Sequence, residues 1–470
     1  MKARKPRIGL LPLYLALYDK VVPQFRAGRE AFARALAERL RGRGLEVELA
    51  PVCCVKAQVE EVVKLLEAKD VDLLATVHLA YSPSFEAIDA LNATRLPLAL
   101  LDTTEAERFD ATATMADMFA NHGIHGVQDL ACVLRRWDRD YFVLTGHAAD
   151  EAFLDDVALT ARAARAARAF RECIILLFGK PFEGMGDFAV ELDYLDRRHG
   201  AFPIEVSVEE LAARVAAVTD EELDAEEAGD PERFDAAGVS REALRESNRV
   251  GLAVRRLIEV KGASAFTMNF QAFDRDAGLP TVPFLEASKA LARGIGYAGE
   301  GDVLTAAFLA ALMAGFGDAT FTEMFCPDWA GDAVFMSHMG ECNVAMAKDR
   351  PRLVEKDYRF GNVCKPVVAL MTLKPGPATL ANIAPRSPLY QGLQMAVTAA
   401  GVEVLDRGLS PNFPDVPHFW VRPQGGGIGG FLRRYSEAGG THHLALLPGD
   451  HAEGLRRMAR MLGWAFARLP

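Results

Sequence analysis

The sequence predicts an α/β protein with two Rossmann-like, doubly wound α/β domains and a C-terminal antiparallel β-rich, barrel-like domain. Three observations favour this fold class. Short apolar runs alternate with amphipathic helical stretches through the first third of the chain, and a second α/β unit begins near residue 170. From about residue 318 the chain is richer in Pro, Gly and short β-like runs. Strand–helix alternation is typical of parallel sheets, whereas successive short strands favour antiparallel pairing.

The domain boundaries follow from these changes of pattern. A chain of 470 residues is too long for a single hydrophobic core. We expect an N-terminal α/β domain over residues 1–170, a central α/β domain over 171–317 and a C-terminal β-rich domain over 318–470.

The predicted first domain starts with a strand, after which helices and strands alternate. The last two predicted strands are continuous apolar runs that we expect to be buried. The predicted strands cover residues 7–17, 46–53, 71–81 and 96–102, and the predicted helices cover 31–44 and 59–68. Ligands of parallel sheets bind at the carboxyl ends of the strands, where the sequences "LLDTT" and "ANHGIHG" would lie.

Two segments of the later domains have alternative interpretations. The acidic stretch 207–238 opens with a capping box from Ser207 to Glu210, and we interpret it as a solvated helical pair rather than an acidic docking surface.

The run "QGGGIGG" at 424–430 precedes a helical stretch and could hold a phosphate. It lacks the lysine and the spacing of known phosphate loops, so a flexible loop is the favoured interpretation.

Composition excludes several classes of function. The 53 basic and 64 acidic residues give a net charge of −11, which does not suit a nucleic-acid partner. Seven cysteines without a CxxC pair fit a reducing cytoplasm. The N-terminal segment lacks the cleavage site of a signal peptide, and the longest apolar run, 303–316, is too short to cross a bilayer. We therefore expect a cytoplasmic protein without a membrane partner.

Four ionisable residues lie in unusual surroundings. Glu300, Glu323, His338 and His443 are each flanked by glycine, small or apolar residues. Burying such groups without partners is costly, and one divalent cation would satisfy all four. Two carboxylates and two imidazoles suit Mn²⁺, with Co²⁺, Fe²⁺ or Zn²⁺ also compatible. Taken singly, each glutamate is compatible with a turn residue and each histidine with a core residue. On a strand, His442 and His443 point to opposite faces, so one of the two at most faces a common site.

Several sequence blocks resemble those of a known enzyme family. The blocks that contain the four ionisable residues are "GYAGEGDVLTAAFLAALM", "TFTEMF", "GDAVFMSHMGECN" and "EAGGTHHLALL". Earlier blocks in consistent order are "HLAYSPS", "MADMFANHGIHG", "FGKPFEGMGDF" and "AFTMNFQAF". Together they are similar to the L-arabinose isomerase and L-fucose isomerase superfamily, closer to the arabinose branch. The block after the first strand differs from that branch, and His122 stands where the branch usually has glutamine.

The resemblance implies an enzyme that interconverts an aldose and its ketose through an enediol. It places the metal ligands at Glu300, Glu323, His338 and His443, with Mn²⁺ the expected ion and Co²⁺ an alternative. The two glutamates would act as acid and base. It implies a monosaccharide substrate and a homo-oligomer, trimer or hexamer, in which the first domain of a neighbouring subunit completes each active site. The implied substrate contacts are His122, His125, Met185 and Phe270.

Other interpretations remain open from the residues alone. Met185 and Phe270 are compatible with core positions. His122 and His125 could form a second metal pair on a helix, but their glycine neighbours favour a loop that contacts substrate. The enzyme could be a metal-dependent epimerase or aldolase that stabilises a similar intermediate, or the α/β domains could bind sugar without catalysis.

Overall fold

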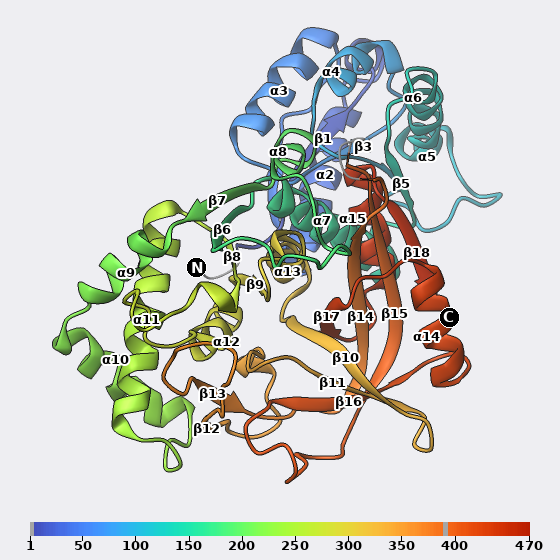
Figure 1. The fold of residues 1–470 in the computed structure, drawn as a ribbon. Helices are drawn as coiled ribbons and strands as arrows, with labels where there is room; N and C mark the ends of the chain where they lie inside the picture. Colours follow the sequence, from blue (N-terminus) through green and yellow to red (C-terminus); the bar gives the residue numbers. More distant parts are fainter. Residues whose placement is uncertain (1–3, 389–392) are drawn as a thin grey trace. The chain divides into compact units, whose positions relative to one another are not determined.

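The computed structural model describes residues 4–388 and 393–470 (Figure 1). The chain divides into two compact units, residues 4–165 and 166–470, which we call the N-terminal unit and the C-terminal unit. Across the described residues, no helix has both the length and the apolar character needed to cross a membrane. The division into three domains stays a prediction.

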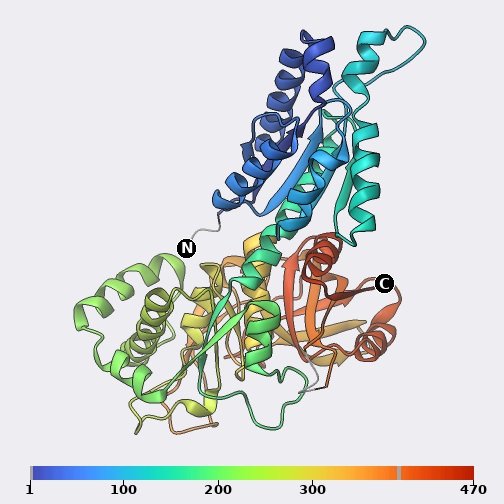
Figure 2. The same ribbon diagram turned by 90° about the horizontal axis from the view of Figure 1, so that it is seen from above.

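The N-terminal unit is built on a five-stranded parallel sheet with the strand order β2-β1-β3-β4-β5. Helices lie on both faces of this sheet (Figure 2), so its central strands are almost entirely buried and read as continuous apolar runs. The strands are β1 (Arg7–Leu13), β2 (Glu46–Leu49), β3 (Leu73–His78), β4 (Leu98–Asp102) and β5 (Phe142–Thr145). The helices are α1 (Ala16–Val21), α2 (Phe25–Gly42), α3 (Lys56–Ala68), η1 (Ser84–Glu86), α4 (Ile88–Ala93), α5 (Met115–Asn121) and α6 (Ile124–Arg136), followed by α7 (Glu151–Arg171).

The C-terminal unit begins with a second parallel sheet of order β7-β6-β8-β9. Its strands are β6 (Ile174–Phe178), β7 (Phe202–Val206), β8 (Ala265–Met268) and β9 (Gly296–Ala298). Its helices are α8 (Leu192–Tyr194), η2 (Leu195–His199), α9 (Val208–Ala216), α10 (Asp220–Arg233), α11 (Arg241–Lys261), η3 (Phe270–Ala272), α12 (Phe284–Ala292) and α13 (Val303–Phe316). Helix α13 is apolar all round because it contacts strands β8 and β9 of this sheet and strands β14 and β17 of the barrel described next.

The rest of the C-terminal unit contains a closed antiparallel barrel, seen in Figure 1 as the yellow, orange and red strands. The strand order is β14-β17-β10-β11-β16-β15, the pairing of β14 with β15 closes the ring, and β18 adds to β15 in parallel. The barrel strands are β10 (Thr320–Asp328), β11 (Ala333–Ser337), β14 (Gly376–Pro385), β15 (Met395–Leu405), β16 (His418–Pro423), β17 (His443–Pro448) and the added β18 (Ala465–Leu469). The other elements are η4 (Val344–Met346), the hairpin β12 (Arg352–Glu355) and β13 (Val367–Leu370), α14 (Gly427–Glu437) and α15 (Ala452–Leu462).

The predicted fold class is confirmed, and the local predictions have mixed outcomes. The first strand ends at Leu13 rather than continuing to residue 17. Ser207 accepts a hydrogen bond from the Glu210 backbone, which is one half of the predicted capping box. The acidic helix α10 pairs with arginines of α11, among them Arg245, so its charge is largely neutralised by its neighbour. The favoured flexible loop at 424–430 is wrong for residues 427–430, which form the first turn of α14. The carboxylate of Asp332 accepts a hydrogen bond from the Ile428 backbone in this turn, where a phosphate would otherwise bind.

Candidate metal centre

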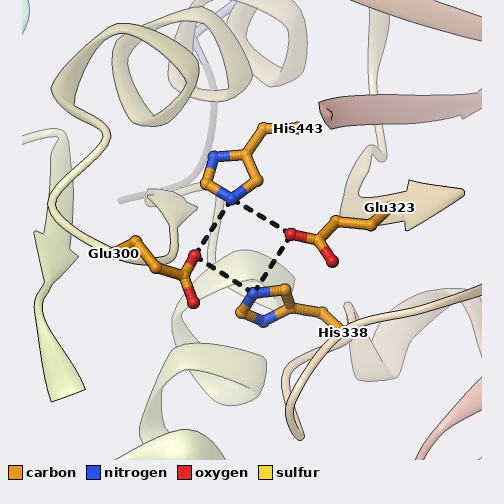
Figure 3. A group of neighbouring side chains, drawn as sticks. All are labelled: Glu300, Glu323, His338 and His443. Atoms are coloured by element: carbon orange, nitrogen blue, oxygen red, sulfur yellow. Dashed lines mark hydrogen bonds and ion pairs between the residues drawn. The ribbon is translucent and has the colours of Figure 1, made fainter. Parts of the chain in front are cut away.

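Four side chains from separate segments of the C-terminal unit converge on one point (Figure 3). Glu323 lies on β10, where it pairs with Ser337 of β11 on one side and with His443 of β17 on the other. His338 directly follows Ser337 at the end of β11. Glu300 follows the carboxyl end of β9 in the parallel sheet. The barrel register therefore brings three of the groups together, and the parallel sheet supplies the fourth.

The distances between their polar atoms are short. The His443 Nε2 atom lies 3.0 Å from Glu300 Oε2 and 3.2 Å from Glu323 Oε1. The His338 Nε2 atom lies 3.3 Å from Glu300 Oε2 and 3.7 Å from Glu323 Oε1. One donor atom from each residue can be chosen so that all lie within 4.8 Å of one another. Both imidazoles thus present Nε2 to both carboxylates.

The backbone around Glu300 is shaped to bring this carboxylate inward. Glu300 has a φ of 53°, the left-handed region that non-glycine residues rarely adopt. A Cβ atom on the preceding Gly299 would lie 2.7 Å from the His338 Cε1 atom, so only glycine fits there. On the other side, a Cβ atom on Gly301 would lie 2.6 Å from Pro181 Cα. Strained backbone of this kind is concentrated at functional sites.

A second pair of carboxylates fixes the two imidazoles. His338 Nδ1 lies 2.7 Å from Glu341 Oε2, and His443 Nδ1 lies 2.8 Å from Asp302 Oδ2. Glu341 also accepts hydrogen bonds from the Tyr297 hydroxyl and from the backbone of Gly340. Because Nδ1 donates to a carboxylate in each ring, Nε2 faces the centre of the group, which is the arrangement of metal-binding histidines in proteins.

Burial and charge act in opposite directions on these groups. Burial by itself raises the pKa of the Glu300 carboxyl, but the imidazoles of His338 and His443 outweigh it and hold that pKa below its ordinary value. The pKa of Glu323 is lowered for the same reason. Burial lowers the pKa of both histidines, and the surrounding carboxylates reverse this and raise it well above 6.5. Without a metal, protons on the imidazoles therefore balance the carboxylate charge.

The donor set fits a divalent cation. Glu300, His338 and His443 are 6 %, 4 % and 0 % exposed, so two carboxylates face each other with little water to screen them. A cation at the centre would neutralise both and would replace the protons on Nε2. Two oxygen and two nitrogen donors suit Mn²⁺, Co²⁺, Fe²⁺ or Zn²⁺ better than Ca²⁺ or Mg²⁺, which prefer oxygen.

Comparison with known proteins identifies the family. The model of the L-arabinose isomerase central domain matches residues 198–316, and the model of the L-arabinose isomerase C-terminal domain matches residues 318–465. The chain belongs to the L-arabinose isomerase family. It is 29 % identical to an L-arabinose isomerase of a Nocardioides species, over 84 % of this chain and 79 % of that protein. The L-arabinose isomerase of Acidothermus cellulolyticus is 26 % identical, over 92 % of this chain and 87 % of the relative.

Membership in this family makes the protein an enzyme, an aldose–ketose isomerase. The resemblance of the sequence blocks to this family is thereby confirmed. The interpretation as a sugar-binding protein without catalysis is set aside.

His442 makes different contacts from its neighbour His443. Its backbone N–H donates to Asp187 Oδ2 at 2.9 Å, and its Nδ1 lies 2.6 Å from the same oxygen. The His442 Nε2 atom lies 3.6 Å from Glu323 Oε1, and the side chain is 40 % exposed. His443 is the buried member of the pair that joins the four-residue group. His442 lies beside that group, at its exposed side.

The other predicted substrate residues are distributed over both units. Met185 lies in the loop between β6 and α8, with its backbone N–H bonded to the Phe182 carbonyl. Phe270 is half-buried and packs against Phe182 and Phe360 with ring centroids 5.6 and 5.9 Å apart. Both residues therefore belong to the C-terminal unit, as the four-residue group does.

His122 and His125 lie in the N-terminal unit. The expected loop is wrong for His125, which is in the first turn of α6, whereas His122 directly follows the last residue of α5 and lies in the short connection between α5 and α6. Gly123 precedes α6 and does not break it. His122 Nε2 lies 2.9 Å from the Tyr18 hydroxyl, and His122 Nδ1 lies 2.9 Å from the Met118 carbonyl. Both ring nitrogens of His122 are thus already bonded within this unit.

Sequence reasoning missed the residues that support the four. Glu341 lies three positions after His338, the ligand that it supports, so its spacing could have suggested this role. Asp302 lies close to Glu300 in the sequence but bonds His443, which the spacing could not reveal. Phe188, whose ring stacks on His443 at 5.0 Å, and Phe321, whose ring meets His338 edge-on at 4.6 Å, gave no comparable signal. Only their placement in the tertiary structure identifies them.

Proposed function

We propose that this isomerase depends on a divalent metal, preferentially Mn²⁺ with Co²⁺ as the alternative, and that it converts an aldose such as L-arabinose to its ketose through an enediol. The observation that carries the proposal is the convergence of Glu300, Glu323, His338 and His443, with both Nε2 atoms facing both carboxylates. The substrate class is supported by the names of the relatives, which are L-arabinose isomerases. When bound, the cation supplies Lewis-acid polarisation of a carbonyl oxygen.

The two glutamates are proposed to move the protons. Isomerisation removes a proton from C2, adds one to C1 and transfers one between the two oxygens. We assign the carbon-bound proton to Glu323, whose side chain is 16 % exposed, and the hydroxyl proton to Glu300, whose side chain is 8 % exposed. The more open carboxylate can approach the carbon chain of the sugar, and a positioned carboxylate contributes about 10²- to 10⁴-fold to such a transfer.

The four-residue group is proposed to work in a homo-oligomer, a trimer or a hexamer, in the cytoplasm. The N-terminal domain of a neighbouring subunit would supply His122 and His125 to each site, and Met185 and Phe270 would contact the sugar from the same subunit. Large exposed apolar side chains of the N-terminal unit support a subunit contact, with Phe85 and Met115 being 75 % and 65 % exposed. Co-expression of Glu323→Gln with His125→Ala subunits should restore part of the activity that each variant lacks alone, because some sites would then combine two intact halves.

The direct test is a screen of aldoses. The protein is treated with EDTA, reloaded with Mn²⁺ or Co²⁺, and incubated with L-arabinose, other pentoses, 6-deoxyhexoses and hexoses, and the products are identified by NMR. We expect a ketose from at least one aldose with metal and none after chelation. Full turnover in EDTA would disprove the metal dependence. A C2 epimer or a cleavage product in place of a ketose would favour the epimerase or aldolase alternative.

A further inference from the structure

The segment that follows β12 has one buried and one exposed side. Lys356 and Tyr358 are buried, whereas Asp357 and Arg359 are exposed and form an ion pair with each other at 2.8 Å. The alternation is that of an extended chain, whose successive side chains point to opposite sides. Lys356 and Tyr358 therefore face the interior of the C-terminal unit together, although neither is apolar at its tip.

One of these two polar tips has no bonding partner in the described residues. The Tyr358 hydroxyl is fully buried and forms no hydrogen bond with any residue that the structure describes. The Lys356 residue is 7 % exposed, but its ammonium is not one of the fully buried polar groups without a partner, and the carboxylates of Asp415 and Glu341 act on its charge. Buried polar groups are nearly always hydrogen-bonded, so the unpartnered Tyr358 hydroxyl indicates a missing acceptor.

Contacts of the Tyr358 ring place it beside the candidate metal centre. The ring packs edge-on against Phe284, with centroids 6.0 Å apart. Phe284 in turn lies against Gly340, since a Cβ atom there would be 3.2 Å from Phe284 Cδ2. Gly340 immediately precedes Glu341, the carboxylate that fixes His338. One aromatic ring therefore separates Tyr358 from the loop that carries His338 and Glu341.

Burial and the charges of the site keep the Tyr358 hydroxyl in its donor form. Burial raises the pKa of the Tyr358 phenol well above its ordinary value, and the carboxylates of Glu341 and Glu300 add to this effect. Burial lowers the pKa of Lys356, and Asp415 and Glu341 oppose that change. Tyr358 consequently remains an O–H donor throughout the working range of pH.

A row of aromatic rings leads from Tyr358 to the surface. Tyr358 contacts Phe360 at 5.4 Å, Phe360 contacts Phe270 at 5.9 Å, and Phe270 contacts Phe182 at 5.6 Å. Phe360 is 59 % exposed. Apolar rings beside a few well-placed polar groups are typical of small-molecule sites.

We propose that Lys356 and Tyr358 bind hydroxyl groups of the aldose, with the rings of Phe360 and Phe270 beside the carbon chain of the sugar. This inference rests on the proposed function and adds two residues that determine which sugar is accepted. Sugar hydroxyls accept hydrogen bonds from both donors, which would satisfy the Tyr358 hydroxyl that the protein itself leaves without a partner. An analogue without the recognised hydroxyl would be rejected because the Tyr358 hydroxyl would again be unpaired.

The test compares Tyr358→Phe, which removes one oxygen atom, with the wild type on the preferred aldose and on its monodeoxy analogues. We expect KM for the aldose to rise about tenfold with kcat within about twofold, a change typical of one lost hydrogen bond. The preference of the wild type for the aldose over one deoxy analogue should fall by a similar factor. Lys356→Met should act in the same direction. Tyr141→Phe is the matched control, because the Tyr141 hydroxyl already donates to the Ala131 carbonyl in the N-terminal unit.

Unchanged KM and unchanged preference in Tyr358→Phe would overturn the proposal and assign the hydroxyl to a bound water. A fall in kcat at constant KM would also overturn it, since the residue would then support Glu341 rather than bind sugar. If the variant folds by circular dichroism but is inactive, calorimetry with the corresponding alditol decides, and affinity equal to that of the wild type contradicts binding. Failure of the proposed function would look different, because the metal-loaded wild type would isomerise no aldose.

Discussion

Two clusters of buried charge in the C-terminal unit are stabilised in different ways. The metal cluster consists of Glu300, Glu323, His338 and His443. The ion network lies between α10, α11 and α12 and consists of Glu226, Asp230, Arg255, Glu286 and Lys289. In the ion network, Lys289 Nζ lies 2.8 Å from both Glu226 and Asp230, and Arg255 lies 2.8 Å from both Glu226 and Glu286. Each carboxylate of the network thus has a permanently charged partner.

The metal cluster has no permanent cation. Its only basic groups are imidazoles, whose charge depends on protonation, and its carboxylates lie on backbone that holds them in place. In the ion network, burial raises the pKa of Glu226, but Arg255 and Lys289 outweigh it and lower that pKa without any ligand. The comparison shows that a buried cluster neutralised by its own residues supports the fold, whereas one that needs protons or a metal is available for binding.

The largest expected effect separates the two clusters by activity. Glu323→Gln and Glu300→Gln should each lower turnover at least about 1000-fold, because each removes a proton-transfer group and a metal donor together. Steady-state kinetics on the best aldose measures this. Asp224→Asn on the exposed side of α10 is a control that should keep full activity. Wild-type turnover in both glutamate variants, with unchanged circular dichroism, would contradict the assigned roles.

The second prediction breaks the ion network. Lys289→Met should lower the free energy of unfolding by about 3–5 kcal/mol, because Glu226 and Asp230 would be left buried without their shared cation. Urea unfolding followed by circular dichroism measures the shift. At temperatures where the variant stays folded, its kcat should match that of the wild type. A stability within about 0.5 kcal/mol of the wild type would mean that Arg255 and Arg233 compensate fully.

The third prediction concerns the carboxylates behind the metal cluster. Asp302→Asn and Glu341→Gln should weaken Mn²⁺ binding about 10- to 100-fold, since each imidazole would lose the acceptor that orients Nε2. Titration calorimetry on the EDTA-treated protein measures the affinity. Asp187→Asn is an informative comparison, because Asp187 bonds His442 rather than a member of the metal cluster. Equal losses in all three variants would point to a general loosening of the site.

The last prediction is a difference in pH dependence between the two clusters. The raised pKa values of His338 and His443 mean that protons compete with the metal above pH 6.5, so Mn²⁺ affinity should increase as pH rises above 6.5. The ion network should not respond in this range. The stability that the lowered pKa of Glu226 contributes is present above the ordinary glutamate pKa and is lost only in strong acid. A Mn²⁺ affinity independent of pH would contradict the protonated imidazoles.

Much of this protein could be predicted from the sequence, because its local patterns and its global fold agree. Continuous apolar runs such as 73–78 predicted strands buried on both faces, and successive short runs after residue 318 predicted antiparallel pairing. Solvated charges do not need small and apolar neighbours. The sequence around each residue of the metal cluster therefore predicted that these four side chains are buried. Less local features were not predicted. Helix α6 begins directly after Gly123 and forms despite the internal Gly126, because its apolar face is buried against the sheet and tertiary packing overrides local propensity.

The sequence by itself determined which residues can hold a metal, because carboxylate and imidazole chemistry is fixed by residue type. Only the tertiary structure decided that these four meet. Glu323 lies beside His443 because of the register of β10 and β17, and Glu300 turns inward because its backbone adopts a left-handed conformation. Contacts between strands 120 residues apart depend on how the whole barrel closes, and no window of sequence contains that information. The same reason explains why Tyr358 looks ordinary in the sequence, whereas the tertiary structure leaves its buried hydroxyl without a partner among the described residues.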